Sequence, residues 1–312
     1  MSDRQITDMT LGSYRFTIVD SEQKYGSRIL GRTFKMGGTY PDCVNVSIAY
    51  DSQGQPIRAS IPHIMSDPEC SKGAPLDRGG GSVLMLKALL RHVHERIPSI
   101  TRFSFDDMSH IECGTEDEIR SRRHAKKGSY ARPIPLNYFS IVFNGYTWYE
   151  KNFGAMYQSE EKHAEYRRRV KEFLTEEKMP PFVEFLQENP AVSMLLEREE
   201  MVKELEGLYE KSSTYKDLFT SIPKERRCPH ARLWLIAFVT KKLRGIFSHE
   251  DWFIDVTRMD EPVAPLSGGR RRKGSGGGRR TRKRGDSFYV PRGFRREGGD
   301  WGHMIGVDSM EV

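Results

Sequence analysis

The sequence predicts an α+β protein with a mixed β-sheet, flanking helices, a helical insertion and a basic C-terminal tail. Three observations support this prediction. The first 65 residues are rich in β-branched and aromatic types, a helix-to-strand pattern follows them, and residues 158–250 show charged, helical patterns. Hydrophobic residues make up 37% of the 312 residues, which is enough for the core of one large or two ordinary domains.

Strands are expected throughout the first 65 residues. Residues 12–20 and 27–35 are rich in aromatic and β-branched types and are separated by a short polar break. Residues 44–50 and 56–64 are two further β-rich runs on either side of a short loop that contains Gly54. This second pattern predicts a β-hairpin.

A helix and another strand are expected next. Residues 73–81 form a glycine-rich loop, and apolar residues then recur every three or four positions, which predicts an amphipathic helix over residues 82–97. The apolar positions of this helix are Val83, Leu86, Leu90, Val93 and Ile97. Pro98 ends the helix, and residues 100–108 have the apolar anchors of a strand.

The middle of the chain changes character twice. Residues 109–133 are polar and are expected to form an exposed excursion. Residues 134–155 are dense in aromatic side chains and are predicted to be mostly helical, with Gly154 as the C-terminal cap. A strand over residues 138–143 is the competing interpretation.

The charged region that follows is predicted to be helical. Its four main helical segments are residues 160–174, 181–189, 191–212 and 231–247. Thr214, with Asp217 three residues later, has the spacing of a capping box. The alternation of apolar residues after Asp251 then predicts a strand.

This order divides the chain into four parts. They are an α/β domain over residues 1–157, a helical insertion or subdomain over 158–250, a candidate returning strand of the sheet over 251–260, and a Gly/Arg-rich basic tail over 261–312. The composition of the tail predicts disorder.

The tail accounts for the whole net charge of +7. Its nine basic residues are Arg270, Arg271, Arg272, Lys273, Arg279, Arg280, Arg282, Lys283 and Arg284. Without these nine, 41 basic residues face 43 acidic ones, so the rest of the chain is nearly neutral. A cationic segment of this kind binds nucleic acid or another polyanion by counterion release, and its aromatic residues could stack on unpaired bases. A nuclear import signal and a solubilising linker are the alternatives.

No membrane partner is expected, and the compartment is expected to be intracellular and reducing. The longest wholly apolar run, residues 233–239, is far shorter than the roughly 20 residues that span a membrane. Residues 1–10 lack the apolar core of a signal peptide. The cysteines, Cys43, Cys70, Cys113 and Cys228, show no repeated spacing, which is typical of a reducing compartment.

The sharpest candidate for chemistry is the stretch from Arg78 to Ser82, just before the first helix. Glycines let the backbone approach a ligand closely, and the N–H groups of a helix start suit a phosphate. The Rossmann and P-loop patterns are both absent from this position. The alternative is a flexible turn between the hairpin and the helix.

Five features follow one another in the sequence: a strand hairpin, an Arg-x-x-Gly loop, an amphipathic helix, a strand and an aromatic helix ending in "WYEKNFGA". This order resembles that of the GNAT family of N-acetyltransferases. The resemblance covers residues 12–155, with 251–258 as a candidate final strand. It implies that acetyl-CoA is bound with its pyrophosphate on the amides of residues 79–84. The implied cofactor-binding residues are Arg78, Gly79, Gly80, Gly81, Ser82 and Val83. Val83 departs from the family pattern, which has Gly or Ala there, and its side chain could crowd the pyrophosphate.

The resemblance also implies a catalytic role for Tyr149. This residue occupies the place of the tyrosine that, in many members, protonates the departing thiolate. The alternative is a packed aromatic side chain, like its neighbours Tyr146 and Trp148.

The sequence does not identify a general base, and it predicts no metal site. Four titratable residues lie at or after the second core strand, near the expected acceptor site, and solvated loop residues are the competing explanation for them. They are Asp106, Asp107, His110 and Glu112. His110 with Cys113, and Cys228 with His230, match no common zinc spacing.

Two functions follow from these patterns. The first is an N-acetyltransferase in which an acceptor amine attacks acetyl-CoA directly, or a descendant that kept the fold and lost the chemistry. The second is a non-enzymatic viral structural or nucleic-acid-associated protein that acts through its basic tail. A Gly/Arg-rich tail after such a body, with the aromatic run 147–155, resembles uncharacterised proteins of large DNA viruses. That resemblance implies a protein of the host cytoplasm or nucleus, or of the virion, with virion proteins as candidate partners.

Overall fold

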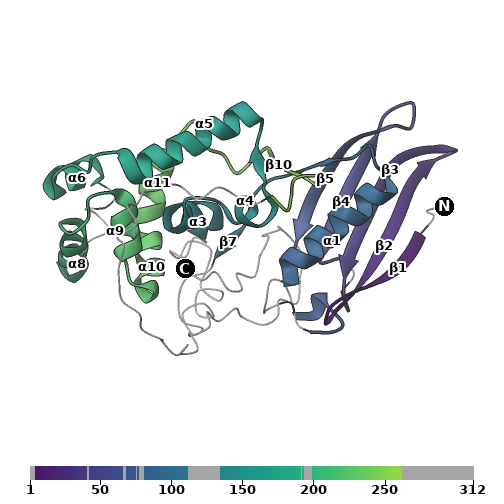
Figure 1. Cartoon of the computed structure of the whole chain (residues 1–312), viewed down its shortest axis with the longest axis horizontal. Helices are drawn as coiled ribbons and strands as arrows, with labels where there is room; N and C mark the ends of the chain where they lie inside the picture. The colour runs from purple at the N-terminus through teal and green to yellow at the C-terminus, as the bar shows by residue number, and fades with distance from the viewer. Residues whose placement is uncertain are drawn as a thin grey trace, which may run out of the picture.

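The computed structural model shows an α+β fold built on an eight-stranded, mostly antiparallel sheet (Figure 1). It describes residues 4–40, 42–65, 68–74, 76, 81–111, 134–190, 192 and 199–261. Residues 262–312 of the predicted tail and residues 112–133 of the predicted excursion lie outside these ranges.

The main sheet has the strand order β1-β2-β3-β4-β5-β6-β10-β9. Its strands are β1 (Arg4–Leu11), β2 (Tyr14–Tyr25), β3 (Arg28–Gly37), β4 (Val44–Tyr50), β5 (Pro56–Ile64), β6 (Arg102–Phe105), β9 (Met156–Tyr157) and β10 (Trp252–Asp255). The sequence singled out neither β1 nor the short strand β9. A separate pair joins β7 (His110–Ile111) to β8 (Ile134–Pro135).

One face of the sheet is covered by α1 (Gly81–Arg96), as Figure 1 shows. Alternate residues of the central strands face this helix, because successive side chains of a strand point to opposite faces. The buried residues of the strands include Phe16, Ile18, Phe34, Met36, Val44, Val46 and Ile48, and those of the helix include Met85, Leu86, Leu89, Leu90 and Val93. The amphipathic helix predicted from the sequence is therefore confirmed.

Helix α1 links the two parallel neighbours of the sheet, β5 and β6. The other neighbouring strands of the main sheet pair antiparallel. Parallel strands require a crossover of this kind, since a tight turn cannot connect them.

The aromatic segment forms two short helices, α3 (Leu136–Asn144) and α4 (Trp148–Phe153). Gly145 and Gly154 end them in the left-handed conformation, with φ of 81° and 59°. Gly154 as a C-terminal cap is thus confirmed, and a strand over residues 138–143 is wrong.

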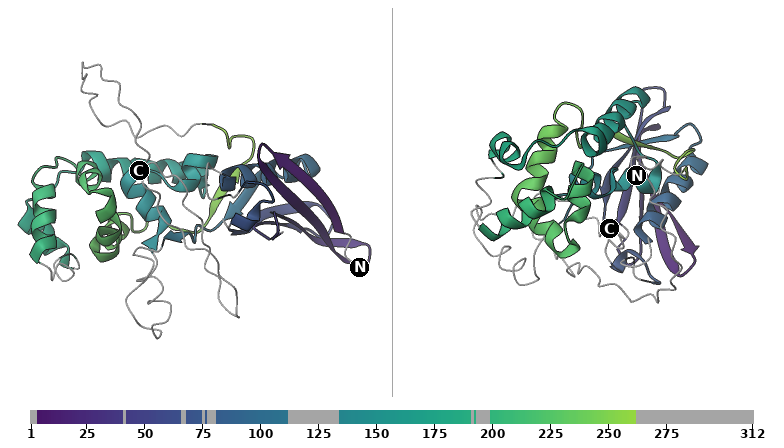
Figure 2. Two further views of the ribbon diagram at one scale, coloured as in Figure 1. Left: turned by 90° about the horizontal axis from the view of Figure 1, so that it is seen from below. Right: turned by 60° about the vertical axis from the view of Figure 1, so that its left-hand side comes forward.

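A block of helices follows β9 and occupies the end of the molecule away from β1–β4 (Figures 1 and 2). It comprises α5 (Glu160–Lys171), the π-helical turn η2 (Glu172–Glu176), α6 (Phe182–Glu188), α8 (Glu199–Tyr209), α9 (Tyr215–Ser221), α10 (Lys224–His230), the π-helical turn η3 (Ala231–Leu235) and α11 (Ile236–Lys242). The side chain of Thr214 accepts a hydrogen bond from the Asp217 amide and caps α9, as its spacing predicted. Strand β10 then returns to the sheet between β6 and β9.

Cys43 and Cys70 form a disulfide across 27 residues. Cys70 belongs to the 3₁₀ turn η1 (Pro68–Cys70), so the bridge ties the segment after β5 to the start of β4. Irregular cysteine spacing therefore did not exclude a disulfide, and the presence of this bridge does not define the compartment.

None of the helices in the described part of the chain is both long and apolar enough to cross a membrane.

Candidate active site

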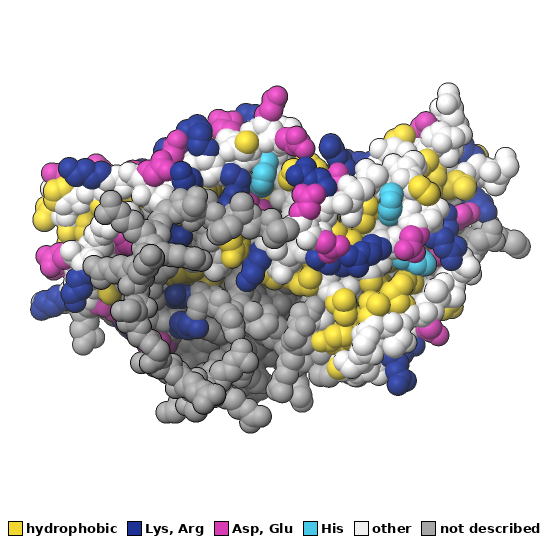
Figure 3. Space-filling model, in the orientation of Figure 1, with side chains coloured by type: hydrophobic (Ala, Val, Ile, Leu, Met, Phe, Trp, Pro, Cys, Tyr) yellow, Lys and Arg dark blue, Asp and Glu magenta, His cyan; other side chains and the backbone are white. Residues whose placement is uncertain are grey.

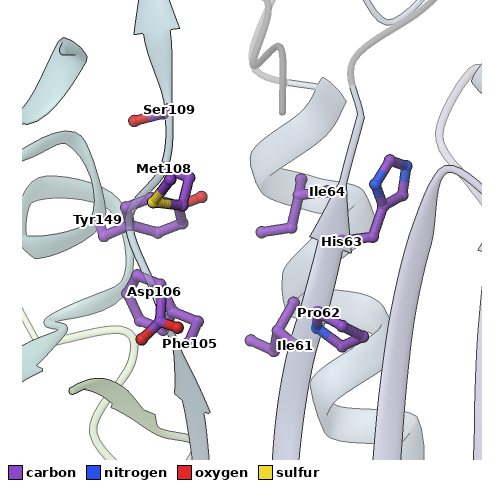
Figure 4. Close-up of a pocket in the computed structure, with 9 residues that line it drawn as sticks. All are labelled: Ile61, Pro62, His63, Ile64, Phe105, Asp106, Met108, Ser109 and Tyr149. Atoms are coloured by element: carbon purple, nitrogen blue, oxygen red, sulfur yellow. The ribbon is translucent and has the colours of Figure 1, made fainter. Parts of the chain in front are cut away.

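A cleft opens where β5 and β6 separate. The two strands pair only at Ala59 with Phe103 and at Ser60 with Ser104, and beyond these pairs they diverge (Figure 4). The space between them is small: about 20 Å³ is open to the centre of a water-sized sphere, within a hollow of about 260 Å³ that includes open solvent. Its walls are Ile61, Pro62, His63 and Ile64 on one side, and Phe105, Asp106, Met108, Ser109 and Tyr149 on the other. Ligands of sheets with parallel strands often bind at the carboxyl ends of those strands.

A β-bulge in β5 lies at the same place. Pairing runs from Ser47 with Ser60 to Asn45 with His63, so Val46 alone faces two residues of β5. Pro62 is one of those two residues, and it has no N–H to lose from the ladder. Bulges free backbone groups from pairing and are common beside active sites.

The interior of the cleft differs in character from its mouth. Ile61, Ile64 and Phe105 are buried, whereas Asp106 is exposed and the Met108 side chain is 52% exposed. An apolar interior that opens to a carboxylate and a thioether suits a ligand with one apolar and one polar end.

Tyr149 lies on the β6 side of the cleft, where Figure 4 shows it beside Met108. Its residue is only 4% exposed, and its ring centroid lies 4.4 Å from that of Phe105 and 5.0 Å from that of Trp148. Burial, and secondarily the Asp107 carboxyl, raise the pKa of the phenol well above its usual value. The hydroxyl is therefore protonated at neutral pH, so it can give a proton or donate a hydrogen bond but is not a phenolate base.

Asp107 is buried directly behind the cleft. The backbone N–H of Ser109, at 3.2 Å, and the Ser109 hydroxyl both donate to its carboxylate. The Asp107 amide donates to the carbonyl of His249 over 2.6 Å. Burial raises the pKa of this carboxyl to about 6, although the hydrogen bonds from Ser109 oppose that shift. Buried carboxyls with such pKa values cluster at functional sites.

Only part of the glycine-rich loop lies among the described residues. Arg78, Gly79 and Gly80 lie outside the described residues. Gly81 begins α1, and a Cβ there would lie 2.7 Å from Leu76 Cδ2 and 3.0 Å from Tyr14 Cε1. Close packing is therefore a sufficient reason for glycine at this position.

The remaining cofactor candidates lie in the first turn of α1. Ser82 is buried, and Val83 is half-buried and packs against the core. Because α1 connects the carboxyl end of β5 to the start of β6, this first turn lies at the same edge of the sheet as the cleft.

Other sequence candidates lie outside this site or outside the described residues. Glu112 and the nine basic residues of the tail are not described, nor is the side chain of His110. Within the described ranges, no three His, Cys, Asp or Glu side chains gather as a metal site.

The sequence did not indicate the β5 wall of the cleft. The one available signal was Pro62 inside a predicted strand, which marks an edge or a bulge.

No protein-family model, curated protein or solved structure matches this chain. Fold and site together define it as an α+β protein with a small, open cleft at a parallel strand pair.

Proposed function

We propose that this chain binds acetyl-CoA in the cleft between β5 and β6 and transfers the acetyl group to an amine. The main support is that the parallel pair diverges around Tyr149, the residue for which the GNAT resemblance implies a catalytic role. The order of elements agrees with a GNAT-like sheet: hairpin β4–β5, helix α1, parallel strand β6, aromatic helices α3 and α4, and returning strand β10.

The residues of the cleft suit acyl transfer. Acetyl-CoA would supply an acetyl group activated as a thioester. The buried walls Ile61, Ile64 and Phe105 would exclude water from it, and a backbone N–H of β5 that is unpaired where β6 diverges would bind its carbonyl oxygen. As the amine forms its bond to the acetyl carbon and the C–S bond breaks, Tyr149 Oη would give its proton to the departing sulfur, and the proton lost by the amine nitrogen would return to Tyr149 Oη through water.

The first turn of α1 is the proposed place of the pyrophosphate. Helix-start N–H groups and the positive end of the helix dipole favour such an anion. Gly81, Ser82 and Val83 contribute this turn, and Arg78, Gly79 and Gly80 precede it.

A non-enzymatic role is the second candidate. It is favoured by Gly81, whose packing against Leu76 and Tyr14 explains the glycine without a cofactor. In that case the fold would be a carrier for the basic tail, and the partner would be a nucleic acid or a virion component.

Calorimetric titration of acetyl-CoA into the full chain separates these candidates. We expect a binding constant in the micromolar range and a higher melting temperature with ligand. Desulfo-CoA, which keeps the pyrophosphate, should bind, whereas pantetheine alone should bind weakly. No heat and no shift in melting temperature at millimolar acetyl-CoA would contradict the enzyme proposal.

A further inference from the structure

Helix α4, which carries Tyr149, has only six residues and depends on its ends for stability. At its start, the Thr147 hydroxyl accepts from the Glu150 amide over 3.2 Å, and Glu150 Oε2 accepts from the Thr147 amide over 2.6 Å. This is a reciprocal capping box. Gly154 closes the other end.

The carboxylate of Glu150 does more than cap its own helix. It is 1% exposed, and it accepts hydrogen bonds from Tyr166 Oη at 3.0 Å and from Arg167 Nη1 at 3.2 Å. Both donors come from α5, the first helix of the helical block. A capping box needs neither of them, so α5 makes a second attachment to the residue next to Tyr149.

The charge that faces Glu150 is that of Arg167. His163 Nε2 lies 3.8 Å from Glu150 Oε1, but burial and Arg167 lower the pKa of this imidazole to about 4, so it is neutral at neutral pH. Its Nδ1 accepts from the Tyr157 amide. Burial raises the pKa of Glu150, and Arg167 and the hydrogen bonds from Thr147 and Tyr166 oppose that shift. Three donors around one carboxyl suit its ionised form.

We propose that Tyr166 and Arg167 are positioning residues that hold Tyr149 in the cleft by fixing Glu150. A peptide unit joins Tyr149 to Glu150, so a displaced carboxylate displaces the phenol. The helical block is then part of the site: it supplies the supporting contacts of α4, while the sheet supplies the walls of the cleft. The effect on activity rests on the proposed acetyl transfer, but the effect on α4 does not.

Tyr166→Phe removes one donor to Glu150 and keeps the ring, whose centroid lies 5.3 Å from that of Phe247. The matched control is Tyr209→Phe, because Tyr209 is also buried in the helical block and its hydroxyl donates to the Pro180 carbonyl over 2.8 Å, away from α4. Hydrogen exchange of the amides of residues 147–154 is measured in both. We expect roughly 5- to 10-fold faster exchange in Tyr166→Phe, as for the loss of one hydrogen bond, and no change in Tyr209→Phe.

Arg167→Met and Arg167→Lys provide a second pair. Arg167→Met should accelerate exchange of the same amides. Arg167→Lys should keep much of their protection against exchange, because it keeps a cation beside Glu150. With acetyl-CoA and an amine, Tyr166→Phe should lower kcat about 10-fold and leave KM for acetyl-CoA unchanged.

The two proposals fail in different ways. Unchanged exchange over residues 147–154 in Tyr166→Phe, or equal acceleration in Tyr209→Phe, overturns the positioning role whatever the activity. If Tyr166→Phe accelerates exchange over residues 147–154 as expected but the protein does not bind acetyl-CoA, only the proposed enzymatic function is overturned.

Discussion

The buried carboxyl of Asp107 acts electrostatically on the phenol of Tyr149. Burial of Tyr149 is the larger cause of its raised pKa, and the Asp107 carboxyl adds to it. Asp107 follows β6 and Tyr149 lies on α4, so this interaction joins the strand that forms one wall of the cleft to the helix that closes it.

Tyr149→Phe tests the phenol as a proton donor. The ring contacts with Phe105 and Trp148 do not involve the hydroxyl, so the free energy of unfolding should change by only about 1 kcal/mol. Loss of the acid should lower kcat for acetyl transfer by roughly 100-fold, with acetyl-CoA binding retained. Tyr138→Phe is the control, since Tyr138 does not line the cleft. Equal activity of wild type and Tyr149→Phe would remove Tyr149 from the chemistry.

Asp107→Asn should change the pH dependence of stability. The pKa of Asp107 is raised from 3.8 to about 6 in the folded protein. A raised pKa means that the folded state favours the protonated form, so this stability is complete below about pH 4 and is lost as the pH rises through 6. Asn keeps the shape and an oxygen that can accept the hydrogen bonds from Ser109, but it cannot ionise.

The free energy of unfolding of Asp107→Asn should therefore rise relative to that of the wild type as the pH increases. Urea unfolding at pH 4.5, 6 and 7.5 should show a difference in unfolding free energy that moves in favour of Asp107→Asn by about 2 kcal/mol from the lowest to the highest pH. A difference that stays constant over this range would show that Asp107 titrates normally.

Gly81→Ala should destabilise the start of α1. The new Cβ would lie within 3.0 Å of Leu76 Cδ2 and at 3.0 Å from Tyr14 Cε1, so the neighbours must move. Overpacking of this kind costs about 1–3 kcal/mol. Gly207→Ala in α8 is the matched control, because nothing lies within 4 Å of its new Cβ, and it should be neutral or stabilising by up to about 1 kcal/mol. Similar thermal denaturation curves for the two variants would contradict close packing at Gly81.

Local patterns in the sequence predicted much of the fold. Strands β4 and β5 have the bounds that composition and turn residues indicated, and α1 differs from its prediction by one residue at each end. Gly154 and Thr214 could be assigned as caps because capping depends on a few neighbouring residues.

The site depends on distant pairings that such patterns do not contain. The cleft exists because β5 and β6 pair at only two positions and because β5 carries a bulge opposite Val46. In the sequence, Asp107 was one of four titratable candidates; the fold distinguishes it, because the His249 segment and α3 pack against it. The link from Glu150 to Tyr166 and Arg167 joins two helices, and its residues show no pattern in the sequence.

The basic tail should bind nucleic acid independently of the cleft. Acidic and basic side chains are interspersed on the described surface in Figure 3, so the body offers no field of one sign on that face. The tail, in contrast, carries nine cations without an acid between Arg270 and Arg284. Affinity of the full chain for single-stranded DNA should fall roughly 1,000-fold between 50 and 200 mM salt, as expected when six or more phosphates are neutralised.

A chain ending at residue 262 should bind weakly at both salt concentrations. A full-length variant with the nine basic residues replaced by Gln separates charge from length, and it should behave like the shortened chain. Equal DNA affinity of all three proteins at 50 mM salt would exclude the tail as the binding segment.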